Sequence, residues 1–444
     1  MSELLTVRDL RLEFYTRRGM YKVLNGVNLS LRKGEVLGLA GESGSGKSTL
    51  GLTIMGLVAD NAKIVGGDVI FAEHGNLITN AVWPDGKYVA KRGRKIIKRL
   101  NSQLLHIRGK EMTMVFQDSM TSLNPLLKIG YQIGEVIYYH NPRLLAERAL
   151  ARNRATREDM REVVMLLKTR EERDLTRFLN EKGLGGLYEQ INSIWQRPGM
   201  SEVKKERAIL SLAGQRLSGF EKSVLEAVRD NKPVTNVPLY RGYRKRLLIR
   251  EGVRKAVELL SDLSVPHPEK VVDMYPHELS GGMRQRVVIA IALANNPKLV
   301  IMDEPTSALD VTIQAQVLEL VKRLKSKGSS IVFISHDLSV LAEVSDRIAI
   351  MYAGSIVELG ETYDIVNEPK HPYTVALLGA VPTLTEKEIR GIEGEIPDLK
   401  NLPSGCAFHP RCPYVMDVCK KLKPDLITLG GKRQVACFLF GDSK

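Results

Sequence analysis

Apolar and polar residues alternate in short runs at the start of the chain, and this pattern predicts strands separated by turns. A glycine-rich loop over residues 41–48 follows the third run, and residues 49–57 then predict a helix. A strand, a glycine-rich loop and a helix in this order form the context that a phosphate-binding loop requires. The three predicted strands cover residues 4–14, 23–31 and 35–40, with a tight turn at Lys33-Gly34.

In the second half of the chain, continuous apolar runs predict buried strands that alternate with helices. Such alternation implies a parallel sheet that is covered on both faces. We therefore expect an α/β fold with a mainly parallel sheet around the glycine-rich loop and an antiparallel β subdomain at the N-terminus. The expected strands are 112–116, 299–302, 330–334 and 347–352, and the expected helices are 281–294, 312–324 and 338–344.

Between these patterns lies a long charged region of helical character, which looks inserted and would enlarge a helical subdomain. The regular pattern ends near residue 381. We expect one nucleotide-binding domain over residues 1–385, with basic insertions at about 72–110 and 141–250, and a separate C-terminal module over 386–444 that carries all four cysteines.

The net charge of +14 is concentrated in two segments. Residues 91–110 hold eight Lys or Arg and no acid, and residues 141–250 hold 24 Lys or Arg against 14 Asp or Glu. Either segment could face an acidic partner such as lipid headgroups or nucleic acid. A solvated helical surface explains the same charge equally well.

No segment predicts a membrane span, because the longest apolar run has eight residues, Val287 to Ala294, and a span needs about 20. The N-terminus lacks the basic start and apolar stretch of a secretory signal. We therefore expect a cytoplasmic protein whose membrane role, if any, is peripheral.

The loop Gly41-Glu-Ser-Gly-Ser-Gly-Lys-Ser48 fits the pattern G-x-x-x-x-G-K-[ST]. Its glycines allow backbone N–H groups to turn toward a β-phosphate, and the following helix adds its positive end. Lys47 would span the β- and γ-phosphates, while the Ser48 hydroxyl would hold Mg²⁺. The candidate nucleotide-binding residues of this loop are Gly41, Ser43, Gly44, Gly46, Lys47, Ser48 and Thr49.

A second half-site follows the buried strand 299–302, which delivers Asp303 and Glu304 to the edge of the sheet. Asp303 would hold Mg²⁺, and Glu304 would polarise the attacking water. In-line attack on a γ-phosphate depends on such positioning and charge neutralisation. Solvated acids at a strand end are common, but their pairing with the glycine-rich loop favours an NTPase.

The segment Leu279-Ser-Gly-Gly-Met-Arg-Gln285 opens a helix and ends 18 positions before Asp303. Glycines and a serine at a helix start make a second anion site. This segment resembles the signature motif of the ABC ATPases, although Met283 stands where Gln is commoner. The resemblance implies that Ser280, with Gly281 and Gly282, caps the γ-phosphate bound by a partner ATPase subunit.

Other motifs match that family in the right order. Gln117 resembles the Q-loop residue that senses Mg²⁺ and the transmembrane partner, and His336 resembles the switch histidine on the γ-phosphate. Asp310, in Ser-Ala-Leu-Asp, resembles the D-loop aspartate of the dimer interface. Phe14 is our candidate for stacking on adenine, with Tyr21 as the alternative.

The cysteines Cys406, Cys412, Cys419 and Cys437 cluster at the end of the chain. A cytosolic protein is unlikely to use them as disulfides, and their spacing matches neither common zinc fingers nor common ferredoxins. The spacing therefore leaves a metal or cluster site and reduced thiols open. The segment Gly405-Cys-Ala-Phe-His-Pro-Arg-Cys412 resembles peptide-importer ATPases, which implies a [4Fe-4S] cluster, with zinc as the alternative.

Four further segments resemble the ATPase subunits of oligopeptide and dipeptide importers. The resemblance implies ATP hydrolysis with Mg²⁺, coupled to peptide uptake at the cytoplasmic face of the membrane, although oligosaccharide or nickel remains possible. It also implies transmembrane permease subunits, a second and distinct ATPase subunit, and indirectly an extracytoplasmic binding protein. An ABC ATPase acting on ribosomes or DNA is the alternative, but no nucleic acid partner is expected. The segments begin at Gly41, Tyr275, Met351 and His371.

Overall fold

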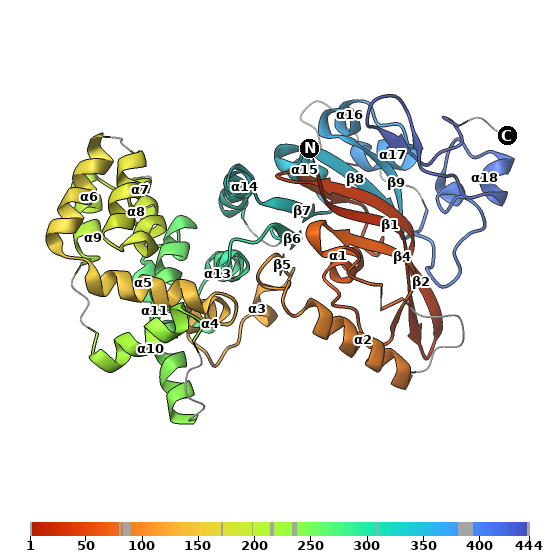
Figure 1. Cartoon of the computed structure of the whole chain (residues 1–444). Coiled ribbons are helices and arrows are strands. Elements are labelled where there is room, and N and C mark those ends of the chain that lie inside the picture. Colours follow the sequence, from red (N-terminus) through yellow and green to blue (C-terminus); the bar gives the residue numbers. More distant parts are fainter. Residues whose placement is uncertain are drawn as a thin grey trace. The chain divides into compact units, whose positions relative to one another are not determined.

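The computed structural model consists of two compact units (Figure 1). The first unit comprises Met1–Gln117 and Asn296–Lys444, and the second comprises Asp118–Asn295. The predicted boundary at 385/386 lies outside the described residues. The described residues are 2–79, 81–82, 90–169, 172–197, 199–213, 217–232, 238–307, 310–380 and 394–441.

The first unit begins with the predicted antiparallel β subdomain, a sheet in the order β2-β1-β4. Leu5 and Val7 face the core before Asp9, and Leu10 and Leu12 face it afterwards. The register shifts at this point, where Asp9 has a φ of 43°. A bulge of this kind moves the alternation by one residue, so that both halves of the strand bury their apolar side. The strands are β1 (Glu3–Thr16), β2 (Gly19–Arg32) and β4 (Ala62–Phe71).

An eight-stranded mixed sheet forms the centre of the first unit, in the order β10-β11-β9-β8-β3-β7-β6-β5. The strands from β8 to β5 are parallel, and β9, β11 and β10 continue the sheet antiparallel. The parallel strands match the predicted buried runs. A strand that is covered on both faces has a continuous apolar sequence and not an alternating one. The strands are β3 (Val36–Ala40), β5 (Met112–Val115), β6 (Leu299–Asp303), β7 (Ser330–Ile334), β8 (Arg347–Tyr352), β9 (Ser355–Glu361), β10 (Ile427–Thr428) and β11 (Gln434–Val435).

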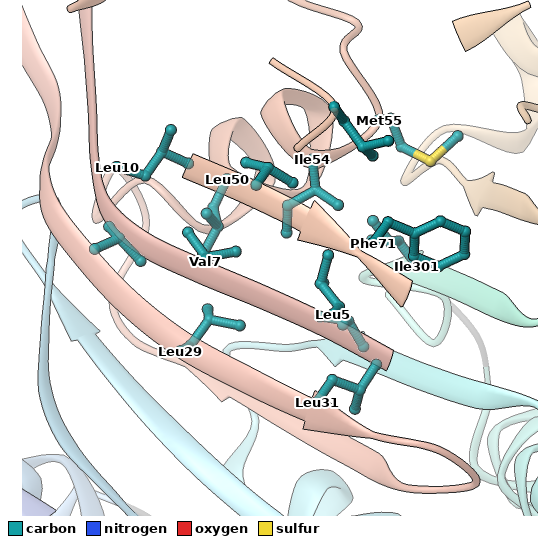
Figure 2. Packing of buried hydrophobic residues seen from close by; sticks show 14 of the residues in the cluster. Leu5, Val7, Leu10, Leu29, Leu31, Leu50, Ile54, Met55, Phe71 and Ile301 are labelled. Carbon is teal, nitrogen blue, oxygen red and sulfur yellow. The ribbon is translucent and has the colours of Figure 1, made fainter. Parts of the chain in front are cut away.

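Helix α1 lies between the two sheets and joins their cores. Figure 2 shows Leu50 and Ile54 of this helix beside Val7 and Leu5 of the antiparallel sheet, with Ile301 of β6 nearby. The helices of this unit are α1 (Lys47–Ile54), α2 (Ala90–Leu104), α14 (Val311–Ser326), α15 (Leu338–Val344), α16 (Thr362–Asn367), α17 (Pro372–Gly379) and α18 (Asp417–Lys421).

Helix α2 belongs to the first predicted basic insertion. Its buried Leu100 and Leu104 join the main hydrophobic core, while Lys95, Lys98 and Arg99 are exposed. The helix is therefore anchored by its apolar face and presents positive charge to solvent.

The second unit is helical, as the sequence predicts for the inserted region (Figure 1). Part of the insertion has a hydrophobic core of its own, which includes Met160, Leu187 and Ile191. The helices are α3 (Ser119–Ser122), α4 (Ile129–His140), α5 (Pro142–Arg154), α6 (Arg157–Thr169), α7 (Glu172–Glu181), α8 (Tyr188–Trp195), α9 (Glu202–Leu210), α10 (Gly219–Arg229), α11 (Pro238–Asp262), α12 (Pro268–Val271) and α13 (Gly281–Leu293).

Part of the insertion's positive charge is neutralised internally. The buried Arg148 donates to Glu258 at 2.5 Å, and Arg152 lies 3.2 Å from Glu251. Such pairs hold α5 against α11, since buried charges require partners. The surface of the insertion at about 141–250 therefore presents less positive charge than the net charge of this segment suggests. Among the described residues, no helix has both the length and the apolar character of a membrane span.

Candidate functional site

The glycine-rich loop connects β3 to α1 as the sequence predicts. Gly41, Gly44 and Gly46 have φ values of 148°, 81° and 104°, which L side chains rarely adopt. A Cβ on Gly41 would lie 2.2 Å from the carbonyl oxygen of Met351, and one on Gly46 would lie 2.9 Å from that of Val23. The loop therefore needs all three glycines for its curvature, and it needs Gly41 and Gly46 also for its close packing on neighbouring strands.

The loop brings Lys47 and Ser48 to the end of β6. The Nζ of Lys47 donates to the carbonyl oxygens of Gly41 at 2.7 Å and Glu42 at 3.0 Å. The Ser48 hydroxyl donates to Oδ1 of Asp303 at 2.9 Å. The structure thus joins the two sequence motifs, although 255 positions separate Ser48 from Asp303.

Glu304 lies at the centre of a second group of predicted residues. Its Oε2 accepts a hydrogen bond from Nε2 of Gln117 at 3.1 Å, and its Oε1 lies 3.2 Å from Nδ1 of His336. The backbone of Glu304 has a φ of 46°. A non-glycine residue in this region is costly and is found preferentially at functional sites. Three motifs that lie far apart in the sequence therefore meet at one carboxylate.

The electrostatics of this site suit a magnesium nucleotide. Burial lowers the pKa of Lys47, although Glu304 and Asp303 oppose this shift. Burial raises the pKa of Asp303, against the hydrogen bond from Ser48. Both shifts arise because a charged group is removed from water. A polyphosphate would stabilise the charged form of Lys47, and Mg²⁺ would stabilise that of Asp303, so these residues fit both groups.

Residues outside the motif 41–48 also hold the glycine-rich loop in place, and the sequence analysis does not predict these contacts. The N–H of Gly354, at the β8–β9 turn, donates to the carbonyl of Ser45 at 2.9 Å. The N–H of Glu42 donates to the Tyr373 hydroxyl at 2.9 Å. Arg411 holds the Glu42 carboxylate through two hydrogen bonds. Apart from the resemblance of their segments to a family, no local pattern in the sequence marks these contacts.

The predicted signature serine begins helix α13 in the second unit. Ser280 is the exposed N-cap residue, and its side chain accepts a hydrogen bond from the N–H of Met283 at 3.3 Å. Gly281 is also exposed, and Gly282 is half-buried. The helix start thus presents its N-terminal backbone to solvent, as an anion site requires.

The remaining candidates have less distinctive surroundings. Phe14 is half-buried, packs against the hydrophobic core and pairs across the sheet with Tyr21, the alternative candidate. Asp310 is the N-cap of α14 and accepts from the N–H of Ile313 at 2.9 Å. Ser43 is exposed at the loop tip, and Thr49 is half-buried in α1. Their roles toward nucleotide remain predictions.

The four cysteines line one cavity in the first unit. The N–H of Cys406 donates to the carbonyl of Cys419 at 2.8 Å, which brings two distant segments together. Burial raises the pKa of Cys406 to about 11 and also raises the pKa values of Cys412 and Cys437. In the part of the chain that the structure describes, no three His, Cys, Asp or Glu residues form a group that could hold a metal ion.

The fold and this site define a P-loop protein that binds and hydrolyses nucleoside triphosphates. The family described as ABC transporter matches residues 24–307, and the one described as oligopeptide/dipeptide transporter, C-terminal region, matches residues 357–419. The chain therefore belongs to the ABC transporter family, as an ATP-binding subunit with ATPase activity.

Curated relatives resemble the chain over almost its whole length. The oligopeptide transport ATP-binding protein OppD of Bacillus subtilis is 35% identical, over 99% of this chain and 89% of its own. The dipeptide transport ATP-binding protein DppD of Haemophilus influenzae is 33% identical, over 98% of this chain and 94% of its own. A solved dimeric ATP-binding cassette, MJ0796 bound to ADP and phosphate, is 19% identical with a TM-score of 0.47, over 81% of this chain and 98% of its own.

Proposed function

We propose that this subunit supplies ATP hydrolysis to a transporter that imports oligopeptides or dipeptides. The observation that carries the proposal is the similarity over nearly the full chain to oligopeptide and dipeptide transport ATP-binding proteins, including the C-terminal region. Oligosaccharide and nickel are the competing solutes. An ATPase subunit of this kind acts on the nucleotide, so its own site does not select among these solutes.

In this proposal, the motifs around the P-loop act together on ATP. Lys47 binds the β- and γ-phosphates, and Ser48 and Asp303 hold Mg²⁺ with Gln117. Glu304 orients and polarises the attacking water, and His336 contacts the γ-phosphate. The contacts of Gln117 and His336 with Glu304 support this assignment, because they place all three groups at one point. The loop residues Gly41, Ser43, Gly44, Gly46 and Thr49 complete the phosphate site.

A second ATPase subunit completes the site in trans. Ser280, with Gly281 and Gly282, would bind the γ-phosphate held by the partner's P-loop, and Asp310 would lie at the interface. The exposed start of α13 supports this role, since a helix N-terminus attracts anions. The chain has one P-loop, so it needs a partner ATPase, and we propose that this partner is a related but distinct subunit.

Peptide should stimulate ATP hydrolysis once the whole transporter is assembled. The subunit, its permease pair, its second ATPase and its binding protein would be reconstituted in proteoliposomes, and phosphate release measured with added tripeptide. We expect at least about a threefold rise, because transport couples closure of the ATPase pair to the loaded binding protein. A rise with nickel or an oligosaccharide, and none with peptides, would replace the proposed solute.

We further propose a [4Fe-4S] cluster at Cys406, Cys412, Cys419 and Cys437. All four thiols line one cavity, yet they do not form a group suited to one metal ion. The support for the cluster is this shared cavity and the resemblance of residues 405–412 to peptide-importer ATPases, and zinc is the alternative. When bound, such a cluster would cross-link residues 394–441, the C-terminal segment, through its cysteines.

Protein purified without oxygen is therefore expected to contain about four iron and four sulfide per chain. The measurement is metal analysis with a sulfide assay, and the matched control is the variant with all four cysteines replaced by serine. One equivalent of zinc without iron would contradict the cluster, and so would iron that persists in the serine variant.

We propose that the subunit lies at the cytoplasmic face of the membrane, against its permease. The exposed Lys95, Lys98 and Arg99 of α2 support contact with anionic lipid, which attracts each nearby base by about 1 kcal/mol. The internal pairing of Arg148 and Arg152 leaves less charge available from the second insertion. Equal binding to neutral and anionic vesicles would count against lipid contact.

A further inference from the structure

Glu42, the second residue of the P-loop motif, connects the loop to the C-terminal segment. Its carbonyl oxygen accepts from Nζ of Lys47 at 3.0 Å and from the N–H of Ser45 at 3.2 Å. Its own N–H donates to the hydroxyl of Tyr373 at 2.9 Å. Each backbone polar atom of Glu42 is therefore engaged in fixing the shape of the loop, and movement of this residue would move the lysine's partner.

The carboxylate of Glu42 is held by Arg411, which lies directly before Cys412. Nη1 donates to Oε2 at 2.9 Å, and Nη2 donates to Oε1 at 3.2 Å, so the pair is bidentate. The side chain of Arg411 is only 4% exposed and that of Glu42 is 23% exposed. Arg411 also donates to the hydroxyl of Tyr352 at 3.4 Å.

We propose that Arg411 is a positioning residue for ATP binding, which acts by neutralising the charge of Glu42 beside the phosphate site. The proposal rests on the proposed ATP site. It assigns the C-terminal segment a direct role in the ATPase: the segment supplies the guanidinium that completes the P-loop.

The physical reason is the sign of the charge at Glu42. A P-loop receives a polyphosphate of high negative charge, and a carboxylate in its second position would repel that ligand unless it were paired. The guanidinium of arginine is protonated at all relevant pH values, and its bidentate contact places this positive charge directly on the acid. The arginine therefore stays charged and cancels the acid.

Loss of Arg411 and loss of the charge on Glu42 should therefore have different effects on ATP binding. Without Arg411, the Glu42 carboxylate remains half-buried and unpaired beside the phosphates, so its repulsion weakens binding. Without the charge on Glu42, the remaining guanidinium does not repel ATP. R411M should thus weaken ATP binding strongly, E42Q should weaken it little, and E42Q should restore binding when combined with R411M.

The buried pair Arg433–Glu358 provides a matched control. Arg433 also belongs to the C-terminal segment, and its Nη2 lies 2.7 Å from Oε1 of Glu358. Glu358 accepts from the backbone N–H groups of Lys370 and His371, and neither Arg433 nor Glu358 has a described direct contact with Glu42 or Arg411. R433M therefore loosens the attachment of the segment while leaving Glu42 and Arg411 in place.

The test is titration of the full-length protein with a fluorescent ATP analogue, together with steady-state ATPase kinetics. We expect R411M to raise the Kd at least about tenfold and to raise KM more than it lowers kcat. R411K should lie between R411M and the native protein, because it keeps the charge but loses the bidentate geometry. The double variant R411M/E42Q, E42Q alone and R433M should each stay within about threefold of the native Kd.

Two results would overturn the proposal while the native protein binds ATP: native affinity in R411M, or an equal loss in R433M. If R411M does not fold, the comparison of E42Q with the double variant R411M/E42Q still tests the proposal. A double variant that binds ATP tenfold more weakly than E42Q would contradict charge compensation. A native protein that binds no ATP would instead refute the proposed function, so the two failures are distinguishable.

Discussion

Replacing Glu304 by glutamine should lower the rate of ATP hydrolysis at least about 100-fold, which corresponds to about 2.7 kcal/mol of transition-state stabilisation. The amide has nearly the shape of the carboxylate but cannot accept the proton of the attacking water. Glu304 contacts both Gln117 and His336, so its loss removes the centre of this group. ATP binding should change less than about threefold, because Lys47 and the loop glycines are untouched. The measurements are single-turnover phosphate release and titration with a fluorescent ATP analogue.

The matched control is Glu319→Gln, which changes an exposed glutamate of α14 in the same unit. This variant should hydrolyse ATP at the native rate. The closed ATPase pair should also accumulate in Glu304→Gln and be visible by size-exclusion chromatography in ATP. Turnover above about a tenth of the native value would show that Glu304 is not the main catalytic carboxylate.

Gly41→Ala should abolish measurable ATP binding. The added Cβ would lie 2.2 Å from the carbonyl oxygen of Met351, and the backbone φ of 148° is one that alanine rarely adopts. The position of the added Cβ is fixed by the backbone of residue 41 and the clashing oxygen belongs to the backbone of Met351, so the clash cannot be relieved by rotating a side chain. The loop must shift, and the carbonyl of Gly41 would no longer meet Lys47, whose Nζ now donates to it at 2.7 Å. The measurement is the Kd for the fluorescent ATP analogue.

Gly34→Ala is the matched control for backbone strain. Gly34 has a φ of 72°, but a Cβ there would meet no atom within 4 Å. This variant should lose about 1 kcal/mol of unfolding free energy and keep native ATP affinity. If Gly41→Ala bound ATP within about threefold of the native protein, the packing of the loop on Met351 would not be required for its function.

The elements of the P-loop unit follow from local patterns in the sequence. Strands β7 and β8 and helix α15 have the predicted boundaries, because continuous apolar runs and their breaks depend on neighbours only a few residues apart. The glycine-rich loop and the acids that end β6 were likewise identified from local sequence. Strands β4, β9, β10 and β11 are not among the predicted strands. Strands β10 and β11 have two residues each and the middle of β4 is half-buried, so their pairing depends on partners elsewhere in the chain.

Contacts between distant segments were decided by the tertiary structure. The parallel sheet brings the ends of β3 and β6 together, so that Ser48 reaches Asp303. The packing of the C-terminal segment brings Arg411 to Glu42, which lies 369 positions earlier. A local pattern shows which residue types are present and how they are spaced. It does not show which distant part of the chain these residues will contact. That choice is made when the chain buries its apolar surface and pairs the charges that burial removes from water.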